Sequence, residues 1–116
     1  MDANEVIDFY TSVMVVGTEK KPACRLDSGI DSVKSHAAAT RTLVGLQCSC
    51  ANTGILIGRI DQLPVITADL ALLTALTQIV PMDIAIPVGQ ELVFHILSST
   101  GTAAATVVAH CHTVRA

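Results

Sequence analysis

Aromatic and charged residues are scarce in this chain of 116 residues. It contains two Phe, one Tyr and no Trp, and charged residues make up 15% of it, whereas an average soluble domain has about 25%. So few aromatic rings provide no stacking platform for single-stranded nucleic acid. The net charge is −3, and basic residues adjoin only at Lys20-Lys21. Because phosphate binding needs concentrated cations, we expect no nucleic-acid partner.

Signals for secretion or for a membrane span are also missing. The first residues, MDANEVIDFY, are acidic and carry no basic segment ahead of an apolar stretch. Asp, Thr, Pro or Gly interrupts every apolar stretch well before the ~18 residues that a transmembrane helix needs. We therefore expect a protein that has no signal peptide and no membrane partner and is made in a reducing cytoplasm. Its four Cys are then expected to be thiols rather than disulfides.

Motifs that would indicate catalysis are missing as well. The sequence has no Gly-x-Gly-x-x-Gly and no Walker-type phosphate loop. Its carboxylates are scattered and form no suggestive pair, and no strained nucleophile turn accompanies its Cys residues. We expect a protein that is not an enzyme.

The apolar residues are abundant and of one kind. They make up 51% of the chain and are mainly Ala, Val, Ile and Leu, which allows a packed core in a single domain of this length. A fold this small must place most side chains near water, and this chain has few ionic groups to place there. Exposed apolar surface usually marks contact with other protein, so we expect a homo-oligomer or a component of a larger assembly.

Alternation of side chains at period two is the main structural signal. It predicts strands over residues 5–16, 38–50, 55–60, 63–67, 82–87, 91–97 and 103–114. Residues 68–77 fit a short helix as well as a strand, and this segment stays open. Pro81 and Pro87 restrict the 82–87 strand to a sheet edge or a strand end. The expected fold is all-β, a small antiparallel β-sandwich of jelly-roll type.

The last two of these strands lead the interpretation. Residues 91–97 alternate, Ser98-Ser99-Thr100-Gly101 breaks the pattern, and a second run extends from Ala103 to Val114. Two apolar runs joined by a short Ser/Thr/Gly break are typical of a hairpin, so we predict that these strands pair.

The polar residues are concentrated near the N-terminus. Residues 17–37 contain more than half of the Lys and Arg residues, and we expect a long loop there, with room for short strand pieces. A loop of this length in a small domain is functional or packs on a partner. We therefore divide the single domain into an N-terminal strand with a polar arm or loop, residues 1–37, and a sandwich core, residues 38–116. The arm could also reach a neighbouring subunit.

Two short motifs contain residue types that bind metal. Cys48 and Cys50 would share one face of a strand, and His110 and His112 would share one face of another. If the two strands were adjacent and in register, four zinc ligands would converge. The competing interpretation, that the thiols are core residues and the imidazoles face solvent or an interface, is favoured because buried Cys is common and zinc usually uses Cys knuckles at turns. We expect no cofactor, with zinc as the alternative.

The C-terminal third resembles small β-sandwich and jelly-roll proteins of phage particles, in particular capsid decoration (cement) proteins. The resemblance lies in Ile86-Pro87-Val88-Gly89-Gln90-Glu91-Leu92, in the Ser98–Ala105 break and in the final Val-rich strand. It implies a non-enzymatic virion protein on the capsid surface, often a trimer, whose partners are the major capsid protein or other shell subunits. The polar arm would act as a clasp and one sheet face as the interface. The alternative is a cytosolic Cys/His metal-binding β-module.

Overall fold

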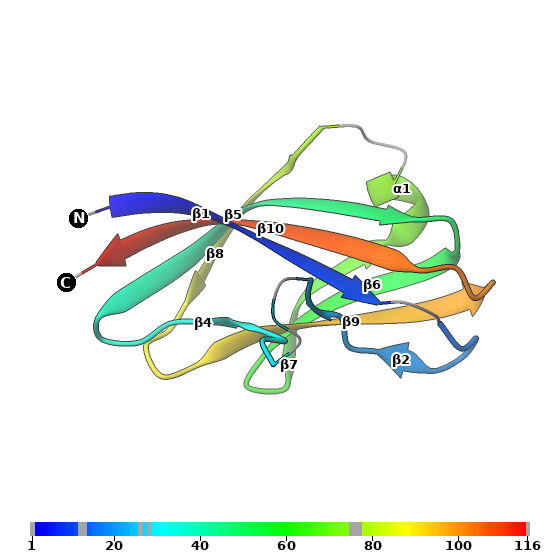
Figure 1. The fold of residues 1–116 in the computed structure, drawn as a ribbon, viewed down its shortest axis with the longest axis horizontal. Coiled ribbons are helices and arrows are strands. Elements are labelled where there is room, and N and C mark those ends of the chain that lie inside the picture. Colours follow the sequence, from blue (N-terminus) through cyan, green and yellow to red (C-terminus); the bar gives the residue numbers. More distant parts are fainter. Residues whose placement is uncertain (1, 12–13, 26, 28, 75–77, 116) are drawn as a thin grey trace.

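The protein is a two-layered sandwich of β-sheets. The computed structural model describes residues 2–11, 14–25, 27, 29–74 and 78–115, and Figure 1 shows the two layers. The predicted all-β sandwich is therefore confirmed. The only helix among the described residues, α1 (Leu70–Thr74), has five residues. No helix in the described part of the chain is long and apolar enough to span a membrane.

One layer, which we call sheet A, is built from five antiparallel strands. Its order is β3-β1-β10-β5-β8. The strands are β1 (Asp2–Thr11), β3 (Ala23–Cys24), β5 (Ala39–Cys50), β8 (Val80–Ile86) and β10 (Ala105–Arg115).

The second layer, sheet B, has the order β2-β9-β6-β7, and β4 also pairs with β9. Its strands are β2 (Glu19–Lys20), β4 (Val33–Lys34), β6 (Thr53–Ile60), β7 (Leu63–Asp69) and β9 (Glu91–Thr100). The short strands β2 and β4 pair with opposite ends of β9, so together they occupy one strand position.

Counting β2 and β4 as one position and leaving out the two-residue strand β3 gives eight main strands in the order of a jelly roll. Sheet A then contains the first, eighth, third and sixth strands, and sheet B contains the second, seventh, fourth and fifth. This is the double Greek key of jelly-roll domains. Most connections therefore cross from one sheet to the other, and the exception is the tight β6–β7 hairpin. Its turn residues Asp61 and Gln62 both have positive φ, as type I′ hairpin turns require.

The predicted hairpin of the last two strands is wrong. β9 pairs with β6, β2 and β4 in sheet B, whereas β10 pairs with β1 and β5 in sheet A. Alternation and a short break fit two strands that face each other across the core as well as two strands that pair. The connection from Gly101 to Ala104 carries the chain between the layers, and Gly101 adopts φ +89° there.

A buried amide fixes this crossing. Asn52, in the neighbouring β5–β6 connection, donates through Nδ2 to the Ala103 carbonyl at 3.0 Å and accepts from the Ala103 N–H through Oδ1 at 3.1 Å. The Ser98 hydroxyl donates to the Gly101 carbonyl at 2.9 Å. These side chains hydrogen-bond to backbone groups of the connection, which lie between the last pairs of sheet B and the first pairs of sheet A.

The core lies between the inner faces of the sheets. Phe9 of β1 and Phe94 of β9 meet there with ring centroids 5.6 Å apart, and both are fully buried. The predicted alternation of β9 is confirmed, because Leu92, Phe94 and Ile96 are buried while the residues between them are partly exposed. The two aromatic rings thus join one strand from each layer.

Alternation along residues 38–50 predicts one face made of Thr42, Val44, Leu46, Cys48 and Cys50, and this is correct only in the second half of β5. Leu46, Cys48 and Cys50 are buried together, but Val44 is exposed and Leu43 is buried instead. The pairing of β5 with β8 shifts register between Leu43 and Gly45. An extra residue at this bulge exchanges the two faces of the strand, which a period-two pattern cannot anticipate.

The remaining segments follow the predictions with shifted ends. Residues 17–37 form a long connection with three two-residue strands, and β8 lies at the edge of sheet A, as Pro81 and Pro87 predict. β1 ends at Thr11 rather than at residue 16, and residues 12–13 lie outside the described residues. β7 continues to Asp69, whose carboxylate accepts from the Ala71 N–H at the start of α1. Residues 75–77 of the open 68–77 segment also lie outside the described residues.

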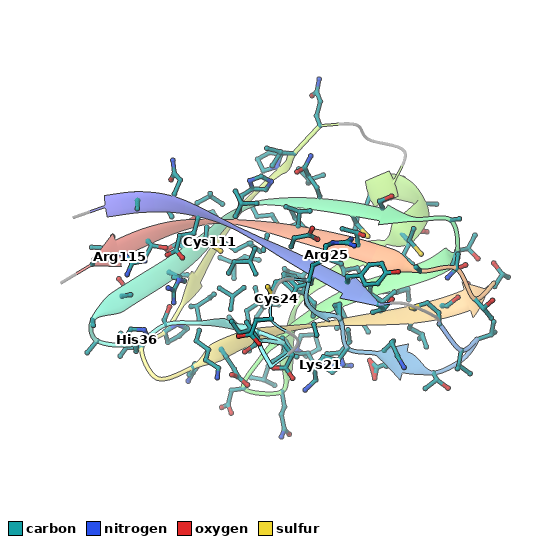
Figure 2. All side chains as sticks on the ribbon, viewed as in Figure 1. Lys21, Cys24, Arg25, His36, Cys111 and Arg115 are labelled. Atoms are coloured by element: carbon teal, nitrogen blue, oxygen red, sulfur yellow. The ribbon has the colours of Figure 1, made fainter. Side chains whose placement is uncertain are left out.

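The N-terminal residues belong to the sandwich. β1 pairs with β10 over its whole length, and the following connection runs from sheet B to β3 in sheet A and back to β4 in sheet B. Arg25, just after β3, lies against β1 (Figure 2), and its Nε donates to Asp8 at 3.0 Å. The polar segment thus connects the two sheets along one side of the chain's own sandwich.

Candidate functional site

The outer face of sheet B carries apolar side chains. Ile55 and Ile57 of β6 point away from the core, because Leu56 between them is fully buried. Leu97 lies directly opposite Ile55 on β9, and Val65 of the edge strand β7 is 45% exposed. A sheet face in contact with water usually alternates polar residues with the buried ones. Ile55, Ile57, Val65, Val93 and Leu97 depart from that rule, and we call these five residues the sheet B patch.

An ion pair spans the middle of this face. Arg59 of β6 donates to Glu19 of β2 across β9, with Nη2 and Oε1 2.8 Å apart. His95 lies between them on β9, and desolvation lowers the pKa of its imidazole, with Arg59 adding to the effect. A neutral imidazole beneath a closed ion pair adds little charge to the sheet B patch.

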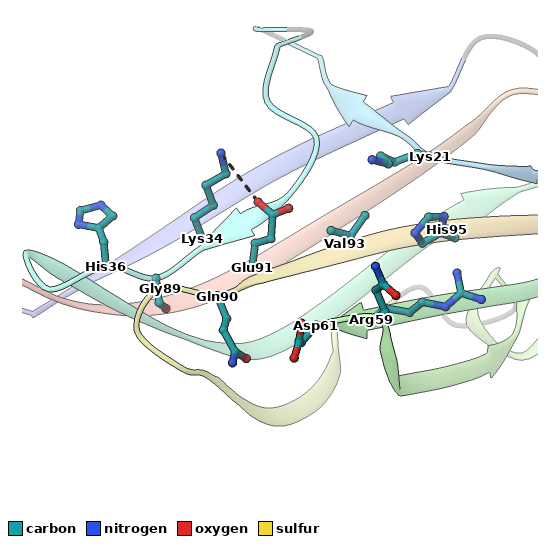
Figure 3. Close-up of a pocket in the computed structure, with 12 residues that line it drawn as sticks. Lys21, Lys34, His36, Arg59, Asp61, Gly89, Gln90, Glu91, Val93 and His95 are labelled. Carbon is teal, nitrogen blue, oxygen red and sulfur yellow. Dashed lines mark ion pairs between the residues drawn. The ribbon is translucent and has the colours of Figure 1, made fainter.

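A cleft lies on this face at the end of β9 near β4, and Arg59, Val93 and His95 of the face belong to its lining (Figure 3). Its volume is about 650 Å³, and its lining is mostly polar. Lys21, Lys34, His36, Arg59 and His95 supply the basic groups, and Asp61 and Glu91 supply the acidic ones.

The charges at the cleft are mostly matched by neighbours. Lys21 pairs with Asp31 at 3.4 Å, and Lys34 pairs with Glu91 at 3.8 Å. Glu91 also accepts a hydrogen bond from the buried Ser32 at 2.9 Å. Exposed pairs of this kind contribute about 0–1 kcal/mol each. An anion entering the cleft would have to compete with these carboxylates, so the lining does not select one sign of charge.

The structure does not bring the four predicted metal ligands together. Cys48 and Cys50 lie on the core side of β5, opposite Val107 and Ala105 of β10. His110 and His112 lie opposite Gly45 and Thr42, further along the same pair of strands. The strands are therefore adjacent, as the zinc hypothesis requires, but the pairs are out of register.

The two pairs also lie on opposite faces of sheet A. Cys111, between the imidazoles, is buried in the core, so His110 and His112 point outward. His110 Nε2 is 2.8 Å from Gln47 Oε1 on that outer face. Among the described residues no group of three or more His, Cys, Asp or Glu could hold a metal ion.

The buried thiols are poor ligands and poor nucleophiles. Desolvation raises the pKa of Cys48 to about 12, and nearby Cys50 adds to the effect. Desolvation likewise raises the pKa of Cys111 to about 11. Because the thiolate is the reactive and metal-binding form, thiols with such pKa values are inert at neutral pH.

A polar cluster on the inner side of sheet A was missed by the sequence argument. Glu5 of β1 accepts hydrogen bonds from the buried Thr113 hydroxyl, from Arg41 Nε at 3.2 Å and from Arg115 Nη2 at 3.4 Å. Arg41 also donates to the Lys34 carbonyl at 2.6 Å, which links sheet A to β4. Figure 2 shows Arg115 near the end of the molecule where both termini lie. The only sequence signal was Glu5 on the apolar side of a strand.

Comparison with known proteins adds no assignment. The chain matches no family model, and it is significantly similar to no curated protein and to no solved structure.

Proposed function

We propose that this chain is a structural subunit of a viral shell, a non-enzymatic protein of the phage decoration (cement) type. The observation that carries the proposal is the sheet B patch on three adjacent strands, in which Ile55 and Val65 are exposed and the other three apolar side chains are partly exposed. Such a surface is stable in water when a protein neighbour covers it. The partners that this function implies are other copies of the chain, which would cover the patch in the isolated protein, and the major capsid protein, to which the oligomer would bind in the shell.

The fold and the composition are compatible with this role. Jelly rolls occur in viral capsid domains, among other proteins, and this is support by analogy because one fold hosts many functions. A contact needs only about 800 Å² per partner to be specific. Repetition around a symmetric particle then adds weak contacts through avidity. A decoration protein on a particle surface needs no catalytic group.

A matched pair of valines tests the proposal. Val65 lies in the sheet B patch and is 45% exposed, whereas Val88 is 57% exposed in the β8–β9 turn. We expect the wild-type protein to sediment as a trimer or larger oligomer, and we expect Val65→Lys to lower its mean mass towards that of a monomer. Val88→Lys should sediment like the wild type. Sedimentation velocity over a wide range of protein concentration measures all three.

Two outcomes would contradict this proposal. One is a wild-type protein that remains a monomer at the highest concentration. The other is an oligomer whose mass responds equally to both substitutions, because the sheet B patch would then have no special part in assembly.

A further inference from the structure

The three long edge strands of the sandwich differ in how they are protected. β7 contains Pro64 and pairs with β6 through a register shift, and β8 contains Pro81 and pairs with β5 through another. Proline and bulges are devices that prevent edge-to-edge pairing. β1 has neither between Asp2 and Thr11, and its inward-pointing carboxylate, Glu5, is paired with Arg41 and Arg115 of its own subunit. Its register with β10 is continuous from Asp2 to Thr11.

In the described part of the chain, the second edge of β1 has no strand partner over its N-terminal half. The described strand that pairs there, β3, meets only Phe9 and Tyr10. The Asp8 carbonyl points to this same side, because it accepts from the Arg25 N–H at 2.8 Å. Successive residues of a strand direct their N–H and C=O groups to alternate sides, so Val6, Asn4 and Asp2 direct theirs to the open edge.

We infer that this edge pairs with β1 of a second copy of the chain, antiparallel and about a two-fold axis at Asn4. Residue 4 then faces residue 4 of the other copy, and Asp2 faces Val6 on both sides of the axis. Each of these pairs exchanges both N–H···O bonds, because all three residues have their backbone groups directed to the open edge. The two copies of sheet A become one continuous sheet.

Side-chain and backbone groups fit this register better than its neighbour. Asn4 Oδ1 lies 3.5 Å from His112 Nδ1 of its own subunit, and its Nδ2 can donate to the amide oxygen of the second copy, which can accept a second hydrogen bond. A register centred one residue later would pair Asp2 with Asp8, whose carbonyl already accepts the Arg25 N–H of its own subunit. The Asn4 register uses the open edge and ends before Arg25.

The charge of Glu5 does not oppose this contact. Its carboxylate is held on the inner side of sheet A by Arg41 and Arg115 of its own subunit. Val6, 62% exposed on the outer face, gains backbone partners and a cross-strand neighbour. This contact is separate from the sheet B patch. It rests on the proposed function and adds a two-fold contact to it. Through this contact, oligomers held together by the sheet B patch could be joined into a shell.

Cysteine cross-linking tests the contact and its register. Cα atoms of a hydrogen-bonded antiparallel pair lie about 5.5 Å apart, which suits a disulfide. In a Cys24→Ser background, which removes the most accessible native thiol, Asn4→Cys should form disulfide-linked dimers under mild oxidation. Val6→Cys is the matched control, because the two copies of residue 6 would be four residues apart along the strands, about 14 Å. It should remain uncross-linked.

A second variant tests the contact without a new thiol. Val6→Pro removes an N–H that faces the open edge and leaves the ladder with β10 intact. Added to Val65→Lys, it should abolish the concentration-dependent association that remains in that variant. The double variant should still unfold cooperatively. Cross-linking of Val6→Cys but not of Asn4→Cys would overturn the register. If neither variant cross-links while the wild type still sediments as an oligomer, the β1 contact is wrong and the shell proposal stands. If neither cross-links and the wild type is a monomer, both fail.

Discussion

At the scale of single residues, the crossing from β9 to β10 constrains Gly101 in both backbone conformation and space. Gly101 has φ +89°, and a Cβ built there would lie 2.4 Å from Asn52 Oδ1. That Oδ1 accepts the Ala103 N–H, so Asn52 cannot move away without losing a buried hydrogen bond. Gly101 therefore meets two independent requirements, one of backbone conformation and one of space.

Gly17 separates these two requirements. It has φ +80° but nothing within 4 Å of its missing Cβ. We expect Gly17→Ala to lower the free energy of unfolding by about 1–2 kcal/mol, the cost of a left-handed backbone with a Cβ. Gly101→Ala should cost more, because it adds the displacement of Asn52. Urea denaturation measures the loss in free energy of unfolding for both variants. Equal losses would show that displacing Asn52 costs no free energy.

At the scale of elements, strand positions followed from the sequence while strand partners did not. The runs around Phe94 and Val107 were predicted because alternation is a local property of each strand. Their pairing was wrong because a four-residue connection fits a hairpin and a crossing equally well. The bulge at Val44 was also invisible, since it is set by β8 and β10 rather than by β5 alone.

The sequence predicted what kind of surface the candidate site has, but it did not predict which part of the fold carries it. Low charge and abundant aliphatic residues predicted exposed apolar surface, and the sheet B patch supplies it. Which face carries it depends on which strands share a sheet. The Cys and His pairs were correctly placed on strands, and these strands are neighbours. Local patterns could not show which side of sheet A each pair lies on or how the two strands are aligned.

Glu5 connects the edge strand β1 to the rest of sheet A, and this link depends on pH. Its pKa is lowered, first by the hydrogen bond from Thr113 and then by Arg41 and Arg115, against a partial desolvation. A group with a lowered folded-state pKa contributes stability above its unfolded pKa and loses it as the pH falls through the folded value. The stability of the wild type relative to Glu5→Gln should therefore be largest above about pH 5 and shrink towards pH 3.

Thr113→Val is the matched variant for this pH dependence. It removes the largest cause of the shift and keeps the shape of the buried side chain, so the acid loss of stability should be smaller than in the wild type and should end at a higher pH. Urea denaturation at a series of pH values, at one protein concentration, measures the three profiles. Parallel profiles for wild type and Glu5→Gln would mean that Glu5 titrates alike in the folded and unfolded chain.

At the scale of the whole molecule, the sandwich holds its Cys side chains in two environments. Cys48, Cys50 and Cys111 lie within the core, whereas Cys24 on β3 is partly exposed. A shell subunit and a metal-binding module make opposite demands on these thiols. In the first they are packing groups released by global unfolding, and in the second a chelator would release Cys48 and Cys50 from the folded protein.

The reaction of the thiols with an aromatic disulfide reagent distinguishes the two. In native buffer we expect one thiol to react quickly, and Cys24→Ser should remove that phase. The other three should react at the rate of unfolding, because burial and pKa values of about 11 and 12 for Cys111 and Cys48 leave almost no accessible thiolate. A chelator should change neither the number of fast thiols nor the melting temperature. Release of two further thiols by the chelator, with a lower melting temperature, would instead favour a metal site and count against the packing role that the jelly roll gives these residues.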